Sequence, residues 1–94
     1  MSGAKSIVHD QAQSRFVIYV DDQEVGFAEY VQDGSVRDFN HTVVSGEFRG
    51  QGLSKPLICE ALMATKEAGL KVKASCSAVE AFVEKNPDFK ELLA

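Results

Sequence analysis

The sequence has no surplus of positive charge, and this absence limits the partners that it can take. It carries 10 basic and 14 acidic side chains, which gives a net charge of −4. Proteins that bind a nucleic-acid backbone gather lysine and arginine on one surface, so we expect no nucleic-acid partner here. Residues 1–44 hold seven acids against three bases, a balance that suits a cationic or amine acceptor.

Cysteines and long apolar runs are also scarce. Cys59 and Cys76 stand 17 residues apart, without a CxxC motif or a histidine at metal-ligand spacing, so no metal site is predicted. Residues 1–15 lack the apolar core of an export signal, and no stretch approaches the roughly 20 apolar residues of a membrane span. We therefore expect a cytoplasmic protein with reduced thiols and no membrane partner.

The length of 94 residues suffices for one hydrophobic core and excludes two. Residues 1–14 are polar and aperiodic, and we expect them to form a tail that is either mobile or lies along an edge. Residues 15–94 are then the folded domain. A core of this size gives modest stability, which leaves a monomer or a weak homodimer open.

Alternating apolar residues predict a meander of three strands. We expect these strands at residues 15–20, 24–31 and 36–44. A turn at residues 21–23 separates the first two, and Asp33-Gly34 is a strong hairpin signal between the second and third, because glycine accepts a positive φ without steric cost.

The apolar spacing changes to a helical period after this meander. Pro56 is compatible with a helix there, because in the first turn its missing N–H has no partner to lose. The further predicted elements are a helix over 51–68 ended by Gly69, a strand over 71–74, a helix over 77–85 opened by a Ser77 capping box, and a third helix with Asn86 as N-cap. The order β-β-β-α-β-α-α predicts an α+β or α/β fold with a mixed four-stranded sheet, packed by helices, whose fourth strand is parallel to the third.

The most informative segment is the turn Arg49-Gly50-Gln51-Gly52-Leu53-Ser54, which leads from a predicted strand into the long helix. Unpaired N–H groups and a partial positive charge at a helix N-terminus bind phosphate, and glycines let the backbone approach it closely. Arg49 and Lys55 add full charges, so the turn predicts a diphosphate site. The P-loop and Rossmann patterns are absent. An ordinary glycine-containing loop is the alternative.

This turn resembles motif A of the GNAT acetyltransferases, [Q/R]-x-x-G-x-[G/A], with Ser54 standing where glycine or alanine is usual. The match extends over roughly residues 24–93 and is similar to the small, one-domain GNAT-like proteins. The residues that carry this wider resemblance are Tyr30, His41-Thr42, Ser75-Cys76-Ser77, Phe82 and Asn86-Pro87. The N-terminal helices and closing C-terminal strands of larger GNAT enzymes are not recognisable in the sequence.

The resemblance implies a minimal GNAT fold and an N-acetyltransferase that uses acetyl-CoA (coenzyme A) and an unidentified amine acceptor. It implies that the Arg49–Ser54 turn holds the CoA diphosphate and that main-chain groups of Val43 and Val44 contact the pantetheine arm. Two other functions stay open. One is a CoA-binding module without catalysis, and the other is a thiol-redox or interaction protein that binds no nucleotide.

Cys76 is the first candidate catalytic residue. It precedes the predicted helix at Ser77, and the positive end of a helix lowers the pKa of a nearby thiol. It could protonate the departing CoA thiolate, or it could carry the acetyl group itself. The resemblance favours a catalytic cysteine, and an inert, buried thiol is the alternative. Cys59 is expected to pack in the core.

Three further residues are candidates. His41, expected on the same strand face as Phe39, could deprotonate an ammonium acceptor or be a structural, hydrogen-bonded histidine. Glu29, expected on one face with Val25, is either a general base or an edge residue that reaches solvent. Asn86 could contact CoA, although helix capping is a sufficient explanation for it.

Overall fold

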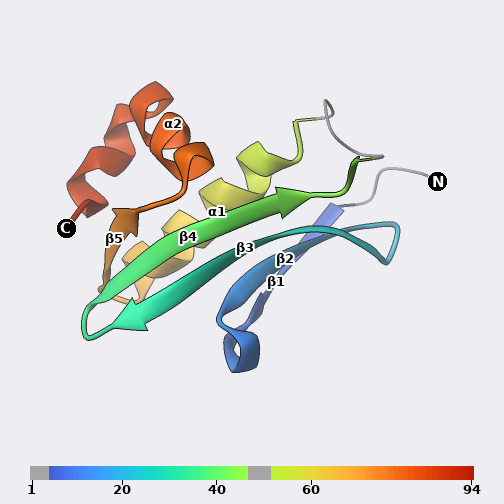
Figure 1. The fold of residues 1–94 in the computed structure, drawn as a ribbon, viewed down its shortest axis with the longest axis horizontal. Coiled ribbons are helices and arrows are strands. Elements are labelled where there is room, and N and C mark those ends of the chain that lie inside the picture. Colours follow the sequence, from blue (N-terminus) through green and yellow to red (C-terminus); the bar gives the residue numbers. More distant parts are fainter. Residues whose placement is uncertain (1–4, 47–51) are drawn as a thin grey trace.

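The chain folds into one mixed five-stranded sheet with its two α-helices on one face (Figure 1). The structure, a computed structural model, describes residues 5–46 and 52–94. The strands, in their order across the sheet, are β1 (Lys5–Asp10), β2 (Arg15–Val20), β3 (Gln23–Asp33), β4 (Val36–Val44) and β5 (Lys71–Ala74). The helices that lie wholly within the described residues are α1 (Ser54–Glu67), α2 (Ser77–Lys85) and the short 3-10 helices η1 (Gln11–Gln13) and η3 (Pro87–Leu92).

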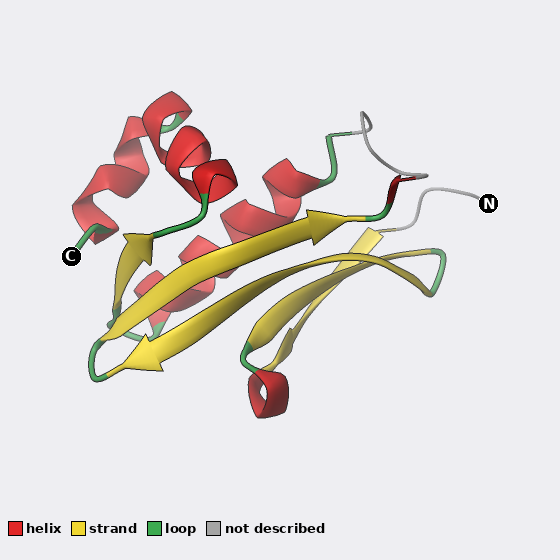
Figure 2. Cartoon of the chain, in the orientation of Figure 1, coloured by secondary structure: helices red, strands yellow, loops and turns green. Residues whose placement is uncertain are grey.

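The predicted meander and crossover are confirmed. β2, β3 and β4 pair in antiparallel fashion, and β5 returns through α1 to pair parallel to β4 (Figure 2). Both hairpin turns use left-handed backbone, with positive φ at Asp21, Asp22 and Gly34. Such turns match the twist of the strands that they join, so the local sequence fixes the register at each end of β3.

The prediction of a four-stranded sheet and an aperiodic tail misses one strand. β1 pairs with β2 from Lys5↔Val20 to Asp10↔Arg15 and forms an edge of the sheet. Ile7 packs against the core, whereas Val8 is 50% exposed. The edge-lying alternative for this segment is therefore right. Polar residues are common on edge strands, where they discourage pairing with other chains, and here they hide the strand period.

The core lies between the sheet and α1. Its buried side chains come from all the principal elements, and among them are Phe16, Ile18, Ala28, Phe39, Leu57, Leu62, Val72 and Val79. Cys59, on α1, is half-buried and does not belong to this cluster, contrary to the expectation of core packing. No helix within the described ranges is long and apolar enough to cross a bilayer.

Helix α1 begins and ends at backbone signals. It starts at Ser54 rather than at residue 51, with Pro56 in its first turn as predicted. Beyond its end, Gly69 has a φ of 76° and donates its N–H to the Lys66 carbonyl, while Leu70 donates to the Thr65 carbonyl. These two bonds make a Schellman motif, which confirms the predicted role of Gly69.

Two β-bulges change the faces that simple alternation predicts. Ile18 pairs with Gly26 and Tyr19 with Glu24, so Val25 is an extra residue in β3, and it is buried in the core at 1% exposure. The prediction that Val25 shares a face with Glu29 is therefore wrong, because an extra residue reverses the order of faces that follows it.

The second bulge lies in β4. Glu29 pairs with His41 and Tyr30 with Phe39, which leaves Asn40 as the extra residue. Phe39 is buried in the core, whereas His41 is exposed on the opposite face. The prediction that His41 shares a face with Phe39 is wrong for the same reason.

The C-terminal helices differ from prediction in their caps. α2 has the predicted bounds, but its N-cap is Cys76, and Ser77 is the first helical residue, so the predicted capping box is wrong. The third predicted helix is a 3-10 helix, η3. Asn86 is the N-cap residue of η3, with Pro87 in the first turn, as predicted. Its side chain makes no cap hydrogen bond there and instead donates its amide to the Phe82 carbonyl near the end of α2 (2.9 Å).

An aromatic cluster holds β1 to the sheet. His9 stacks on Phe16 with ring centroids 4.1 Å apart, and its Nε2 lies 2.6 Å from the Tyr30 hydroxyl. The Arg37 guanidinium lies over the Tyr30 ring, 4.9 Å from the ring centroid. Burial and the nearby Arg37 charge lower the pKa of His9, although Asp10 opposes them.

We predict that acid weakens the fold through His9. The free energy of unfolding should fall as the pH drops below 6.5, the ordinary His pKa, towards the lowered pKa of the folded state, because the unfolded chain binds the proton more readily there. Urea unfolding between about pH 7.5 and about pH 5.5 measures this loss. His9→Gln should cost about 1 kcal/mol at neutral pH and flatten the profile. Equal slopes for His9→Gln and the wild type would contradict the prediction.

Candidate functional site

A gap opens beside β4 where β5 leaves the sheet. The two strands pair only from Val36↔Lys71 to Phe39↔Ala74, and the Cys76 N–H then donates to the Phe39 carbonyl at 2.9 Å. Beyond this bond the chain turns into α2, while β4 continues to Val44. Along its last residues β4 therefore pairs with β3 alone among the described strands.

The Asn40 bulge decides which residues face this gap. Ser45 donates its N–H to the Val25 carbonyl, and the Val43 carbonyl lies so close to Gly26 that a Cβ there would be 2.7 Å from it. Since backbone groups alternate in direction along a strand, those of Thr42 and Val44 point away from β3. The predicted pantetheine contacts of Val43 and Val44 stay predictions.

Cys76 lies at the mouth of the gap as a free, half-buried thiol at the N-terminus of α2. Burial raises its pKa, but the Thr42 hydroxyl and the N–H groups of Val79, Ala78 and Thr42 outweigh burial, so the pKa is lowered overall. The sulfur makes no side-chain cap hydrogen bond of full geometry. The hydroxyl and N–H groups around the sulfur therefore stabilise the thiolate more than the thiol, because a negatively charged sulfur is the stronger hydrogen-bond acceptor.

The other two candidate catalytic residues lie together, away from the thiol. Glu29 and His41 are direct cross-strand partners, and Glu29 is half-buried. The His41 ring is 6.0 Å from the Phe27 ring, and Arg15 covers Phe27 at 5.4 Å. Glu29 and His41 thus belong to the sheet face opposite the helices, whereas Cys76 packs against the core on the helix side.

The predicted phosphate turn is described only in part, because Arg49, Gly50 and Gln51 lie outside the described residues. Gly52 has a φ of 71°, a conformation that glycine adopts without strain. Leu53 is the N-cap of α1 and offers no side-chain cap, and the first turn contains no acid. The positive end of this helix is therefore neither capped nor neutralised by its own side chains.

A cavity of about 230 Å³ joins α1 to α2. It brings together Ser54 and Asn86, two residues of the predicted CoA site that lie far apart in sequence. Its other lining residues are Lys55, Ile58, Ala78, Ala81, Phe82 and Lys85. Lys85 was not predicted for this site, because only the packing of α2 against α1 brings it into the lining of the same cavity as Lys55.

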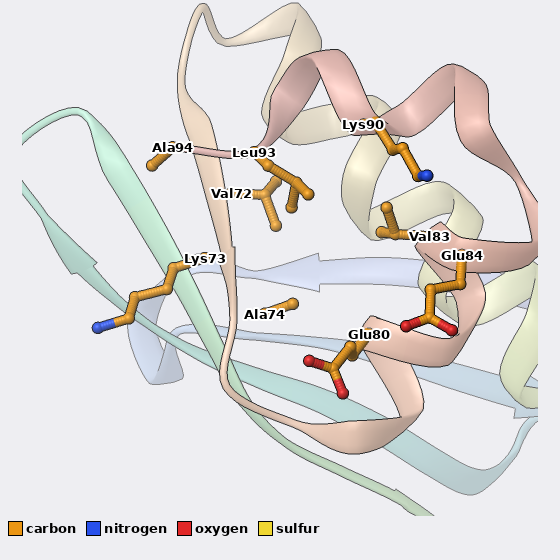
Figure 3. Close-up of a pocket in the computed structure, with 9 residues that line it drawn as sticks. All are labelled: Val72, Lys73, Ala74, Glu80, Val83, Glu84, Lys90, Leu93 and Ala94. Carbon is orange, nitrogen blue, oxygen red and sulfur yellow. The ribbon is translucent and has the colours of Figure 1, made fainter.

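A larger cavity, of about 410 Å³, lies along the other edge of β5 (Figure 3). Val72 and Ala74 of β5 line it together with Val83, and Figure 3 shows Glu80 and Glu84 projecting from α2 at its side. It contains none of the predicted site residues. The candidate site residues Ser54 and Asn86 therefore lie at the smaller of these two cavities.

This fold is that of the N-acetyltransferases. The chain is similar to a GCN5-like candidate N-acetyltransferase from Staphylococcus aureus, with a TM-score of 0.73 and 26% identity over 95% of this chain and 87% of that one. The structure of AAC(6')-Iy in complex with the bisubstrate analogue CoA-S-monomethyl-acetylneamine shares the fold at a TM-score of 0.56 and 19% identity, over 79% of this chain and 57% of that one.

Residues 15–92 match the family model described as GCN5-related N-acetyl-transferase. The chain is also 32% identical to Protein NATD1 of Xenopus tropicalis over 89 residues, which cover 92% of this chain and 81% of that protein. The chain therefore belongs to the GCN5-related N-acetyltransferase family, and the resemblance inferred from its sequence is confirmed.

We predict that folding itself activates the Cys76 thiol. In a Cys59→Ser protein, the rate of alkylation by iodoacetamide should rise with pH through a midpoint below the ordinary thiol pKa, because hydrogen-bond donors stabilise the folded thiolate. The same protein unfolded in urea is the matched control and should show an ordinary midpoint. Coincident folded and unfolded profiles would contradict the prediction.

Proposed function

We propose that this protein transfers an acetyl group from acetyl-CoA to an amine acceptor, with CoA lying in the cavity between α1 and α2. One observation carries the proposal: the uncapped N-terminus of α1 and the C-terminal end of α2 converge on that cavity. The AAC(6')-Iy complex, in which the same fold holds a CoA conjugate, supports this assignment.

The diphosphate would lie at the start of α1. A helix without a side-chain cap presents several N–H groups that need acceptors, and its dipole favours an anion there. Gly52 leaves the approach free of a side chain, and Lys55 supplies a full positive charge beside it. The described residues therefore fit a diphosphate, and Arg49 is proposed as a further contact from the segment outside them.

The second wall of the cavity would hold the rest of the nucleotide. Lys85 adds a second ammonium group, and Asn86 keeps its side-chain oxygen available because its amide group is already bonded to Phe82. From this cavity the pantetheine arm would run along the last residues of β4, beyond the point at which β5 stops pairing with this strand. Its thiol end would then reach Cys76.

The two faces of the sheet at β4 would each provide the groups for one of the two proton transfers in the reaction. The amine attacks the thioester carbon, so it must lose a proton, while the departing CoA sulfur must gain one. Cys76 on the helix side would serve the sulfur, as proton donor or as transient carrier of the acetyl group. Glu29 and His41, paired on the opposite face, would accept the proton of the amine.

We predict that CoA binding depends on the lysines of the smaller cavity. Lys55→Gln or Lys85→Gln should each weaken CoA binding roughly two- to fivefold in calorimetric titrations, because each removes a charge near phosphate. Lys73→Gln and Lys90→Gln are matched controls, since these lysines line the larger cavity, and they should leave the affinity unchanged. Equal losses in all four variants would point to a nonspecific charge effect and contradict the proposed site.

We predict that Cys76 acts in transfer and not in binding. Cys76→Ala should lower acetyl transfer to a reactive amine by about 100-fold or more, as expected for loss of acid–base or nucleophilic help, with the Kd for CoA unchanged. Release of free CoA thiol gives the rate, and Cys59→Ala is the control. Unchanged turnover in Cys76→Ala would remove the thiol from the mechanism. Tight CoA binding without transfer to any amine would instead favour the binding module.

A further inference from the structure

Resting on the proposed function, the geometry points to Thr42 as the positioning residue that orients and polarises the Cys76 sulfur for acetyl transfer. Thr42 does not need to touch either substrate for this role. It acts through Cys76, across the gap that opens between β4 and the start of α2.

The backbone brings the two residues together. The hydrogen bond from Cys76 N–H to the Phe39 carbonyl ties the thiol to β4 just before the bulge at Asn40. Without an extra residue, alternation would place Thr42 on the face opposite Phe39. The bulge reverses that order, and the Thr42 side chain faces the helix side together with Cys76.

The Thr42 hydroxyl is a buried donor without a satisfied bond. Its Oγ1 is buried and has no hydrogen-bond partner of full geometry among the described residues. A buried hydroxyl in that state is unfavourable, because it has lost its hydrogen bonds to water. The adjacent Cys76 sulfur is the group on which this hydroxyl acts, and the interaction strengthens when the sulfur becomes negatively charged. The site thus favours the thiolate over the thiol.

Both proposed routes pass through that thiolate, as the product when Cys76 acts as proton donor and as the nucleophile when Cys76 carries the acetyl group. If Cys76 protonates the departing CoA, its S–H bond breaks, the S–H bond of CoA forms, and Cys76 keeps the electron pair. If Cys76 carries the acetyl group, its thiolate forms the new thioester as the CoA–acetyl bond breaks, and the CoA sulfur takes a proton from solvent. In each case negative charge resides on the sulfur that Thr42 faces.

The test compares Thr42→Val with Thr42→Ser in a Cys59→Ser background. Valine keeps the shape and removes the hydroxyl, whereas serine keeps the hydroxyl, and neither changes the N–H groups of Thr42, Ala78 and Val79 that also face the sulfur. The pH profile of iodoacetamide alkylation should shift upwards in Thr42→Val, with a rate roughly three- to tenfold lower near pH 7, and should be restored in Thr42→Ser. The pH profile of acetyl transfer should shift in parallel.

Two outcomes would overturn the assignment: an unshifted profile in Thr42→Val, or a Thr42→Ser profile shifted as far as that of Thr42→Val. Circular dichroism checks that each variant is folded, and Thr42→Ala replaces Thr42→Val if the latter does not fold. The alkylation assay needs no CoA, so it tests Thr42 even if the CoA titration fails. A failed titration with a shifted profile would therefore disprove the proposed function and leave the Thr42–Cys76 pair standing.

Discussion

The candidate site depends on one peptide hydrogen bond, from the Cys76 N–H to the Phe39 carbonyl. It is the backbone hydrogen bond that ties the start of α2 to β4, and it ends the parallel pairing at a fixed residue. One residue further along β4, the bulge at Asn40 reverses the faces of the sheet to which the following side chains point. Together these two features open the gap, bring Thr42 to the thiol and leave His41 on the other face.

Local signals predicted most of the fold, because they act over a few residues. Gly69 and Asp33-Gly34 end α1 and β3 through backbone conformations that glycine favours, and both were found where expected. The bulges at Val25 and Asn40 depend on cross-strand register, which no single strand encodes, so the predicted faces were wrong. β1 was missed because its polar residues suit an edge and weaken the strand period.

The candidate site was predictable in residue type but not in arrangement. The sequence marked Ser54, Cys76 and Asn86 through their positions at helix ends, where unpaired backbone groups or caps give a residue a recognisable context. Asn86 and Ser54 line one cavity because α2 packs against α1, and His41 and Cys76 lie on opposite faces because of the Asn40 bulge. The sequence indicated Thr42 only as part of the His41-Thr42 pair. The proposed role of Thr42 depends on the Cys76 sulfur that it faces, and the sequence alone does not reveal that contact.

The start of α1 affects both the stability of this helix and the proposed binding of CoA. A serine, threonine or aspartate at the N-cap stabilises a helix by about 1 kcal/mol, yet the N-cap residue of this helix is Leu53, whose side chain is buried and offers no acceptor. An acid in the first turn would also stabilise the helix, and none is present. Either feature would compete with a bound diphosphate for the same N–H groups. In a domain of 94 residues that loss of stability is substantial, and the proposed CoA diphosphate would supply the missing cap. Ligand binding and completion of the fold would then be the same event.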